Sequence, residues 1–209
     1  MYCPAHFEES RPEVLQALIQ ARPLATLVTI GDGGLAADHL PLTLEIAADG
    51  TMQLRGHVAR ANPMWRSLRG GADALAIFQG AASYISPSWY PGKREHGKAV
   101  PTWNYVTVHA HGRLRAIDDT DWLRRQVDAL TRRQESGFAE PWAVTDAPAD
   151  YIEKMLGAIV GVELTIGALC GKWKTSQNQP AANRNGAAQG LRALGGDEAV
   201  AMAALIERG

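Results

Sequence analysis

The spacing of apolar side chains changes several times in the first half of the chain, and each change predicts an element. Residues 11–20 (RPEVLQALIQ) carry apolar side chains at helical spacing and predict a short helix. Residues 24–30 (LATLVTI) are rich in β-branched residues, which is typical of a strand, and they end at the turn signal GDGG. The alternating runs DHLPLTLEI and MQLRGHV follow, separated by a turn at 47–50. These runs predict an antiparallel meander, with Leu40, Leu42, Leu44 and Ile46 on one face.

From about residue 62 onward, the predicted elements change from mainly strands to mainly helices. A short helix is expected near 62–69, and DALAIFQG and VGVELTIGAL read as buried strands. Between them lies the longest alternation, residues 103–115. An aspartate-capped helix (IDDTDWLRRQVDALTRRQE) and a second one (PADYIEKMLGAIV) follow the alternating strand. An alanine-rich helical extension, broken at the glycines 195–196, begins at about 181. Strands first and helices later predict an α+β domain around an antiparallel sheet or barrel, with flanking helices.

The length of 209 residues predicts a single domain, 1–209, with a sizeable core. A formal net charge of −1 lacks the basic excess that is typical of nucleic-acid binding. Two cysteines without motif spacing favour a reduced, cytoplasmic setting. The N-terminus lacks the pattern of a signal peptide, and no apolar stretch approaches a membrane span of about 20 residues, so no membrane partner is expected.

Two motifs match a known chemistry only on paper. GDGGLA fits the dinucleotide fingerprint G-x-G-x-x-A, but it leads into an alternating strand and not into a helix, so it is interpreted as a hairpin turn. His109 and His111 form an H-x-H pair on one strand face, which could ligate a metal. A third ligand is missing locally, so no metal is expected and the pair reads as a polar face that packs on another subunit or lines a pocket.

Three polar or aromatic segments are candidates for a binding site. In GHVARANPMW a strand ends, a small residue and Arg60 follow, and a helix begins at once. This arrangement suits a phosphate, although an ordinary helix cap beside an exposed arginine is the alternative. GKWKTSQNQP gathers hydrogen-bond donors after a strand, as a solvated loop also would. SPSWYPGKREHGKAVPTWNY carries four aromatic residues, which either present flat surface to a ligand or partner or anchor a loop. A planar ligand with a phosphate tail would suit all three.

The chain resembles the PaiB-type FMN-binding negative transcriptional regulators. The matching blocks run in order from Met1 through Pro180: MYCPAHFEE, LATLVTIGDGGLAADHLPL, LRGHVARANPMW, IFQGAASYISPSWY, GKAVPTWNYVTVHAHG and GKWKTSQNQP. The resemblance implies an FMN-binding split β-barrel, related to the pyridoxamine phosphate oxidases, that forms a homodimer with FMN between the subunits. DNA is a partner by the family label only, because the sequence shows no convincing DNA-reading helix.

The resemblance also implies a set of cofactor-binding residues. His39, Leu40 and Pro41 match the strand beside the flavin ring in the related oxidases, and Arg60 and Asn62 match the phosphate corner. By position alone, three late-chain residues from the partner subunit would complete the site: Lys174, Gln177 and Asn178. Trp103, from the aromatic segment, is expected to face the cofactor, a substrate or the partner chain.

Two alternative functions stay open beside the regulator. The first is a flavin reductase or oxidase acting on a small substrate, although a single arginine at the phosphate corner makes this site thinner than that of the oxidases. The second is a haem-binding or haem-degrading split barrel. No residue is assigned as catalytic: His39 and His57 lie near the expected site, but histidine is also a common hydrogen-bonding residue.

Overall fold

The fold is built around an eight-stranded sheet. It comes from a computed structural model that describes residues 1–31, 33–68 and 70–208, with every side chain in these ranges except those of 94–96. The strand order is β3-β2-β6-β7-β8-β5-β4, and β1 also pairs with β8. The strands are β1 (Glu8–Glu9), β2 (Leu24–Gly31), β3 (Gly34–Pro41), β4 (Thr43–Ile46), β5 (Met52–Ala59), β6 (Ala72–Ile85), β7 (Thr102–Ile117) and β8 (Ile159–Lys174).

Helices follow or precede these strands, and each strand pair whose register is defined is antiparallel. The α-helices are α1 (Pro12–Ala21), α2 (Pro91–His96), α3 (Thr120–Glu135), α4 (Ala149–Gly157), α5 (Ala181–Leu194) and α6 (Asp197–Arg208). The 3-10 helices are η1 (Ala5–Phe7), η2 (Pro63–Leu68), η3 (Pro87–Trp89) and η4 (Val144–Asp146). The α+β class predicted from the sequence is confirmed.

The chain divides into two compact units. Unit 1 consists of Met1–Leu18, Phe78–His109 and Cys170–Gly209, and unit 2 consists of Ile19–Ile77 and Ala110–Leu169. The long strands β6, β7 and β8 contribute residues to both units. The assignment of 1–209 as one domain stays a prediction.

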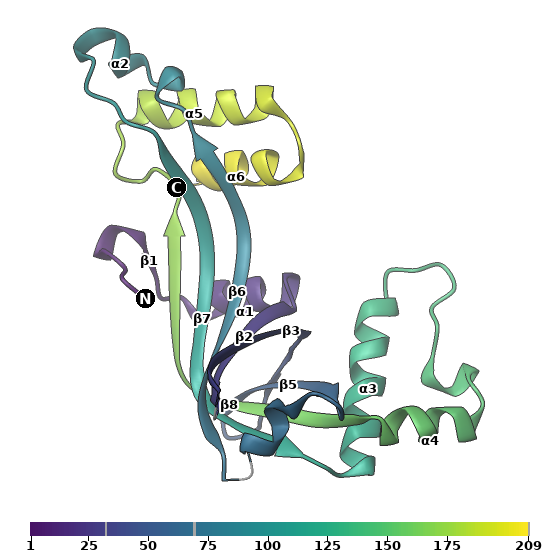
Figure 1. The fold of residues 1–209 in the computed structure, drawn as a ribbon. Coiled ribbons are helices and arrows are strands. Elements are labelled where there is room, and N and C mark those ends of the chain that lie inside the picture. Colours follow the sequence, from purple (N-terminus) through teal and green to yellow (C-terminus); the bar gives the residue numbers. More distant parts are fainter. Residues whose placement is uncertain (32, 69, 209) are drawn as a thin grey trace. The chain divides into compact units, whose positions relative to one another are not determined.

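In unit 2, β2 and β3 form a long hairpin whose register runs from Leu24↔Pro41 to Gly31↔Gly34 (Figure 1). The hairpin closes at the expected GDGG turn, of which Asp32 lies outside the described residues. Gly34 has φ +93°, a left-handed conformation that glycine adopts without steric cost. GDGG therefore ends one strand and begins the next, as the interpretation as a hairpin turn requires.

The alternating run 38–46 is divided where one continuous strand was expected. Leu42 separates β3 from β4, and its N–H donates to the Pro23 carbonyl at 2.9 Å. Leu40, Leu42 and Leu44 are buried as predicted, but Ile46 is exposed at the end of β4 and does not share their environment. The helix expected at 62–69 is the 3-10 helix η2, and residue 69 lies outside the description.

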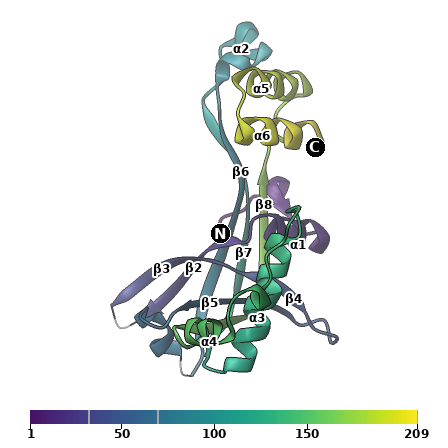
Figure 2. The ribbon, with the colours of Figure 1, turned by 90° about the vertical axis from the view of Figure 1, so that its right-hand side faces the viewer.

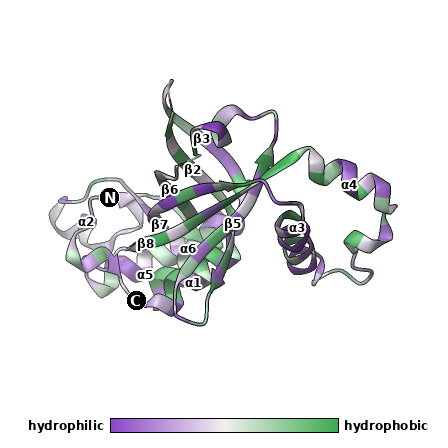
Figure 3. Cartoon of the chain, turned by 90° about the horizontal axis from the view of Figure 1, so that it is seen from below, coloured by the Kyte–Doolittle hydropathy of each residue, from purple (hydrophilic) through white to green (hydrophobic). Residues whose placement is uncertain are grey.

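Helix α3 of unit 2 packs with α4 through a small apolar cluster. The Asp119 side chain accepts a hydrogen bond from the Trp122 N–H at 2.6 Å, which caps the helix where the sequence predicted. Leu123 is buried with Val144, Ile152 and Leu156. Much of α3 is nevertheless hydrophilic (Figure 3), so its polar residues are available to line the space beside the sheet.

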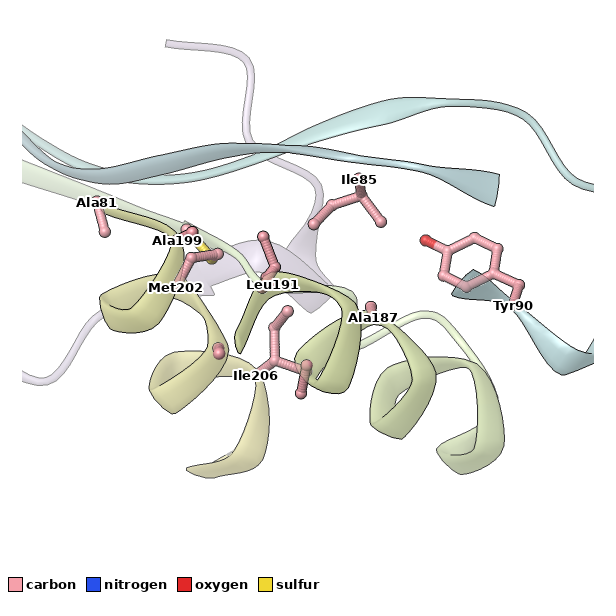
Figure 4. Packing of buried hydrophobic residues seen from close by; sticks show 10 residues of the cluster. Ala81, Ile85, Tyr90, Ala187, Leu191, Ala199, Met202 and Ile206 are labelled. Carbon is pink, nitrogen blue, oxygen red and sulfur yellow. The ribbon is translucent and has the colours of Figure 1, made fainter. Parts of the chain in front are cut away.

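In unit 1, α5 and α6 lie side by side (Figure 2) and bury an apolar cluster against the end of β6. Leu191, Met202 and Ile206 fill its centre, and Ile85 and Tyr90 close it (Figure 4). The two helices are separated by Gly195 and Gly196, both with positive φ, where the sequence predicted a break. The alanine-rich extension from about 181 is thus a packed helical hairpin.

The aromatic segment 86–105 contains helices where the sequence predicted a loop. Pro87 and Pro91 stand in the first turns of η3 and α2, where a missing N–H costs nothing, so they begin helices. Trp89 packs on α5: a Cβ added at Gly190 would lie 2.3 Å from the indole, and one at Gly186 would lie 2.0 Å from the Trp89 carbonyl oxygen. Trp89 and Tyr90 therefore anchor the segment within unit 1, as one of the two readings of the sequence expected.

Candidate functional site

One candidate site of unit 2 is a cavity of about 530 Å³ between the β2–β3 hairpin and η2. The hairpin contributes glycines, alanines and Leu35 together with the Thr29 hydroxyl and the Asp38 carboxylate, and η2 with the residue before it contributes Asn62, Arg66 and Ser67. The lining residues are Thr29, Gly31, Gly33, Gly34, Leu35, Ala36, Ala37, Asp38, Asn62, Pro63, Met64, Arg66 and Ser67.

Asn62 joins the two walls of this cavity. Its Nδ2 donates to Asp38 Oδ1 at 2.7 Å, and its Oδ1 accepts from the Met64 N–H at 2.9 Å. The first bond holds β3, and the second fixes the first turn of η2. Among the residues predicted to bind the cofactor, Asn62 is in the lining of this cavity and the others are not.

Arg66 supplies a positive charge to the same wall. Its guanidinium lies 5.6 Å from the Trp65 ring centroid, and within the part of the chain that the structure describes it has no carboxylate partner. Ser67 stands beside it and donates from Oγ to the Met64 carbonyl at 2.7 Å. This part of the cavity therefore combines a guanidinium, a hydroxyl and a carboxamide, the groups that bind oxyanions.

Arg60, the predicted phosphate ligand, is engaged elsewhere. Its guanidinium donates to both carboxylate oxygens of Asp118, at 2.9 and 2.5 Å, and to the carbonyls of Gly157 and Ile159 at 2.8 and 3.0 Å. This hydrogen bonding lowers the pKa of Asp118 below its ordinary value. Arg60, which directly follows β5, thus connects this strand end to the residue after β7 and to the junction of α4 and β8. Its role toward phosphate stays a prediction.

His39, Leu40 and Pro41 continue β3 beyond Asp38 and are not among the residues that line the cavity. They pair with Thr26, Ala25 and Leu24 of β2, in that order. His39 is exposed and Leu40 is buried, so the two side chains have opposite environments, as alternation along a strand requires. Their contact with a flavin ring stays a prediction.

The remaining predicted cofactor residues belong to unit 1. Trp103 is 58% exposed and meets the Tyr84 ring edge-on, with 6.1 Å between the centroids. Lys174 donates from Nζ to Thr102 Oγ1 at 2.5 Å. Gln177 holds its own turn, accepting from the Thr175 N–H at 2.7 Å and donating to the Trp173 carbonyl. Asn178 is exposed.

Sequence reasoning missed a buried polar cluster beside these residues. Asn104 donates from Nδ2 to Ser176 Oγ at 2.9 Å, and Ser176 has φ +65°, which is uncommon for a residue other than glycine. Burial raises the pKa of the Tyr90 phenol, and its hydrogen bond with Ser176 opposes that shift. The polar run after β8 was the only sequence signal, and its partner Asn104 lay hidden within a predicted strand.

A second polar group was also missed in unit 2. Glu163 is 1% exposed, and its carboxylate accepts from Arg55 Nε at 2.8 Å and from Arg115 Nε and Nη2 at 2.9 and 2.6 Å. Nearby, His57 Nδ1 lies 2.8 Å from Gln126 Oε1. Glu163 had been read as part of an apolar strand, because its partners stand on other strands and leave no local pattern.

Among the residues that the structure describes, no group of three or more His, Cys, Asp or Glu side chains is placed to hold a metal ion. Within the same ranges, no helix is long and apolar enough to cross a membrane.

These features define an antiparallel α+β fold with flanking helices. The chain is similar to the structure of the FAD and heme binding protein from Mycobacterium smegmatis, with a TM-score of 0.59 and 24% identity over 80% of this chain and 73% of that one. It is also similar to a conserved hypothetical protein from Mycobacterium tuberculosis, with a TM-score of 0.57 and 14% identity over 86% and 94%. At these identities the likeness shows the fold, and it confirms the predicted class.

The chain belongs to the family described as "Putative FMN-binding domain", whose model matches residues 1–168. It is 32% identical over 245 residues to an uncharacterized protein of Emericella nidulans, covering 100% of this chain and 98% of that protein. It is 32% identical over 179 residues to the protease synthase and sporulation protein PAI 2 of Bacillus subtilis, covering 86% of this chain and 83% of that protein. The PaiB-type resemblance found in the sequence is thereby confirmed.

Proposed function

We propose that this protein binds FMN in the cavity between the β2–β3 hairpin and η2, with the phosphate at Arg66. The observation that carries the proposal is the arginine without a carboxylate partner, among the described residues, beside Ser67 and Asn62. A phosphate would gain charge-assisted hydrogen bonds there without displacing an existing ion pair. At Arg60, by contrast, it would have to compete with Asp118.

The opposite wall suits the rest of the ligand. Glycines and alanines of the hairpin leave the backbone accessible, so a planar ring can approach it closely. Leu35 and Met64 add apolar surface. Membership of an FMN-binding family over residues 1–168, which include both walls, supports the same ligand.

Arginine-to-glutamine substitutions test the proposal with two ligands. Arg66→Gln should weaken FMN roughly 10–100-fold, since a hydrogen bond to a charged group is worth about 1.5–3 kcal/mol. Riboflavin, which lacks the phosphate, should bind equally well to both proteins. Arg60→Gln is the control, and it should change FMN and riboflavin affinity alike or lower only the stability.

Calorimetry with FMN, riboflavin and FAD measures all three affinities. Selective loss of FMN in Arg60→Gln with none in Arg66→Gln would return the phosphate to the corner predicted from the sequence. Equal loss of FMN and riboflavin in Arg66→Gln, or tighter binding of FAD than of FMN, would refute the proposed site.

We propose a homodimer in which the second copy completes the flavin site with Trp103, Lys174, Gln177 and Asn178. The exposure of Trp103 and Asn178 supports this assembly, since an exposed indole gains from being covered by ligand or partner. Light scattering should give twice the 22.5 kDa chain mass. Trp103→Ala should weaken dimerisation or FMN binding while the urea midpoint of the flavin-free protein stays nearly unchanged. A monomer with full flavin affinity would contradict the assembly.

The role that we propose for the bound flavin is regulatory, in a negative transcriptional regulator of the PaiB type. Similarity to PAI 2 supports this role over that of a flavin reductase or oxidase. Two measurements separate the regulator from the oxidoreductase: a gel shift with the promoter region of the protein's own gene, and stopped-flow bleaching of the bound flavin by NADPH. A shifted fragment with inert flavin supports the regulator. Rapid bleaching with turnover and no shift supports the oxidoreductase, and a haem-type spectrum of the purified protein would replace both.

A further inference from the structure

A second cavity in unit 2, of about 190 Å³, lies between α3 and the strands β4 and β5. It shares no lining residue with the proposed flavin cavity. The residues that line it are Thr43, Glu45, Arg55, Trp122, Arg125, Gln126 and Ala129. Apart from Glu45, its polar side chains can all donate hydrogen bonds.

Two of these side chains are buried and have a polar atom whose hydrogen bonding is not satisfied by the described residues. Gln126 is 6% exposed and Thr43 is 9% exposed. Gln126 Nε2 and Thr43 Oγ1 have no hydrogen-bond partner among the residues that the structure describes. Buried polar groups are nearly always satisfied, so two such atoms lining one cavity indicate that something else occupies it.

The amide of Gln126 is oriented by a neighbour outside the cavity. His57 Nδ1 lies 2.8 Å from Gln126 Oε1, so a proton on Nδ1 is donated to the carbonyl oxygen. The other end of the amide, Nε2, is then left as a donor for the cavity. His57 is therefore a positioning residue for this donor.

The charges around the cavity favour an acceptor with one negative charge. Thr43, Arg55 and Glu163 are paired across β4, β5 and β8, and Arg55 also lies 6.0 Å from the Trp122 ring centroid. Arg55 and Arg115 together exceed the single charge of Glu163 that they share. Arg125 adds a cation at the exposed side, while Glu45 opposes it. The balance is one net positive charge, which suits a monoanion better than a dianion.

We propose that this cavity binds a small monocarboxylate. Its oxygens would accept from Gln126 Nε2, Thr43 Oγ1 and the Arg125 guanidinium, and its body would lie along the Trp122 indole. The volume equals that of about six water molecules at about 30 Å³ each, which limits the ligand to about six to nine non-hydrogen atoms. The assignment is independent of the proposed flavin function, because it uses other residues.

The experiment follows the Gln126 side-chain amide of the full-length protein by ¹⁵N NMR during titration with sodium benzoate. The signal is assigned from its loss in Gln126→Glu, which keeps an acceptor for His57 but places a carboxylate in the cavity. Benzoate should shift the amide saturably at millimolar concentration. Its neutral isostere benzamide and inorganic phosphate should not.

Substitutions locate the site. Thr43→Val, which keeps the side-chain shape, should weaken benzoate by about three- to tenfold without lowering the urea midpoint, because the lost hydroxyl has no protein partner. Arg125→Gln should weaken it by at least about fivefold. Arg124→Gln is the matched control on the same helix, since Arg124 pairs with Glu153 at 3.0 Å and does not line the cavity.

Three outcomes would overturn the proposal. The first is no saturable shift, which means that the cavity holds water only. The second is equal or tighter binding of inorganic phosphate. The third is unchanged benzoate affinity in Thr43→Val and Arg125→Gln, or a large stability loss in Thr43→Val, which would make the hydroxyl structural.

Discussion

Replacing Glu163 by glutamine should destabilise the protein strongly, although the change is nearly isosteric. The carboxylate accepts three hydrogen bonds from Arg55 and Arg115 and is 1% exposed. Glutamine presents an N–H₂ group to one guanidinium and leaves both positive charges unbalanced. Breaking a buried ion pair in this way costs about 3–5 kcal/mol. Because the Arg115 side chain is 62% exposed and water screens part of its charge, we expect about 2–3 kcal/mol.

Urea unfolding, followed by tryptophan fluorescence, measures this loss, and a thermal scan should show a midpoint lowered by about 5–10 °C. Asp73→Asn is the matched control. It removes the partner of Arg113 at 3.3 Å, but Asp73 is 91% exposed, so the free energy of unfolding should change by less than about 0.5 kcal/mol. If Glu163→Gln lost no more than Asp73→Asn, burial would not determine the strength of this cluster.

Three further predictions concern glycine packing and pH. Gly186→Ala should lower the free energy of unfolding, measured by urea melts, by about 1–3 kcal/mol, since its Cβ would lie 2.0 Å from the Trp89 carbonyl oxygen. Gly157→Ala is the control: its Cβ would meet nothing within 4 Å, so this change should be neutral or slightly stabilising. Arg60 lowers the pKa of Asp118, so their ion pair stabilises the fold above about pH 4 and is lost in acid. The free energies of unfolding of wild type and Asp118→Asn should therefore converge as the pH falls, and a constant difference would contradict this. Burial raises the pKa of Tyr90, so the free energy of unfolding should decrease above about pH 10. In Tyr90→Phe this decrease should be less steep, and parallel curves for the two proteins would argue against burial as the cause.

The regular elements could be predicted because their signals are local. The Asp119 cap, the alternation through Leu44 and the break at Gly195 each depend on residues a few positions apart, and local hydrogen bonding and burial determine them. Helix α2 escaped prediction because it lies in the aromatic segment, which was expected to be a loop, although Pro91 at its first turn favours helix entry.

The candidate site was harder to predict, because its contacts join distant parts of the chain. Nothing near Arg60 in the sequence indicates that Asp118 would occupy its guanidinium. Arg66 lies in a short apolar stretch without a motif, yet η2 brings it to the cavity that Asn62 lines. The family resemblance predicts a flavin ligand and a set of candidate residues, but it does not indicate that Asp118 pairs with Arg60 while Arg66 has no carboxylate partner among the described residues.

The division of unit 1 into three chain segments also sets the order in which it can form during synthesis. Ribosomes make the N-terminal segment first, and domains fold as their residues emerge. All of unit 2, which ends at Leu169, has been made before the segment Cys170–Gly209 that completes unit 1. Strand β1 pairs with Lys172 and Gly171, so Glu8 and Glu9 lack their strand partner until then. The segment Met1–Leu18 is thus made long before Cys170–Gly209, and β1 can form its pairing with β8 only after the last segment of unit 1 has been made.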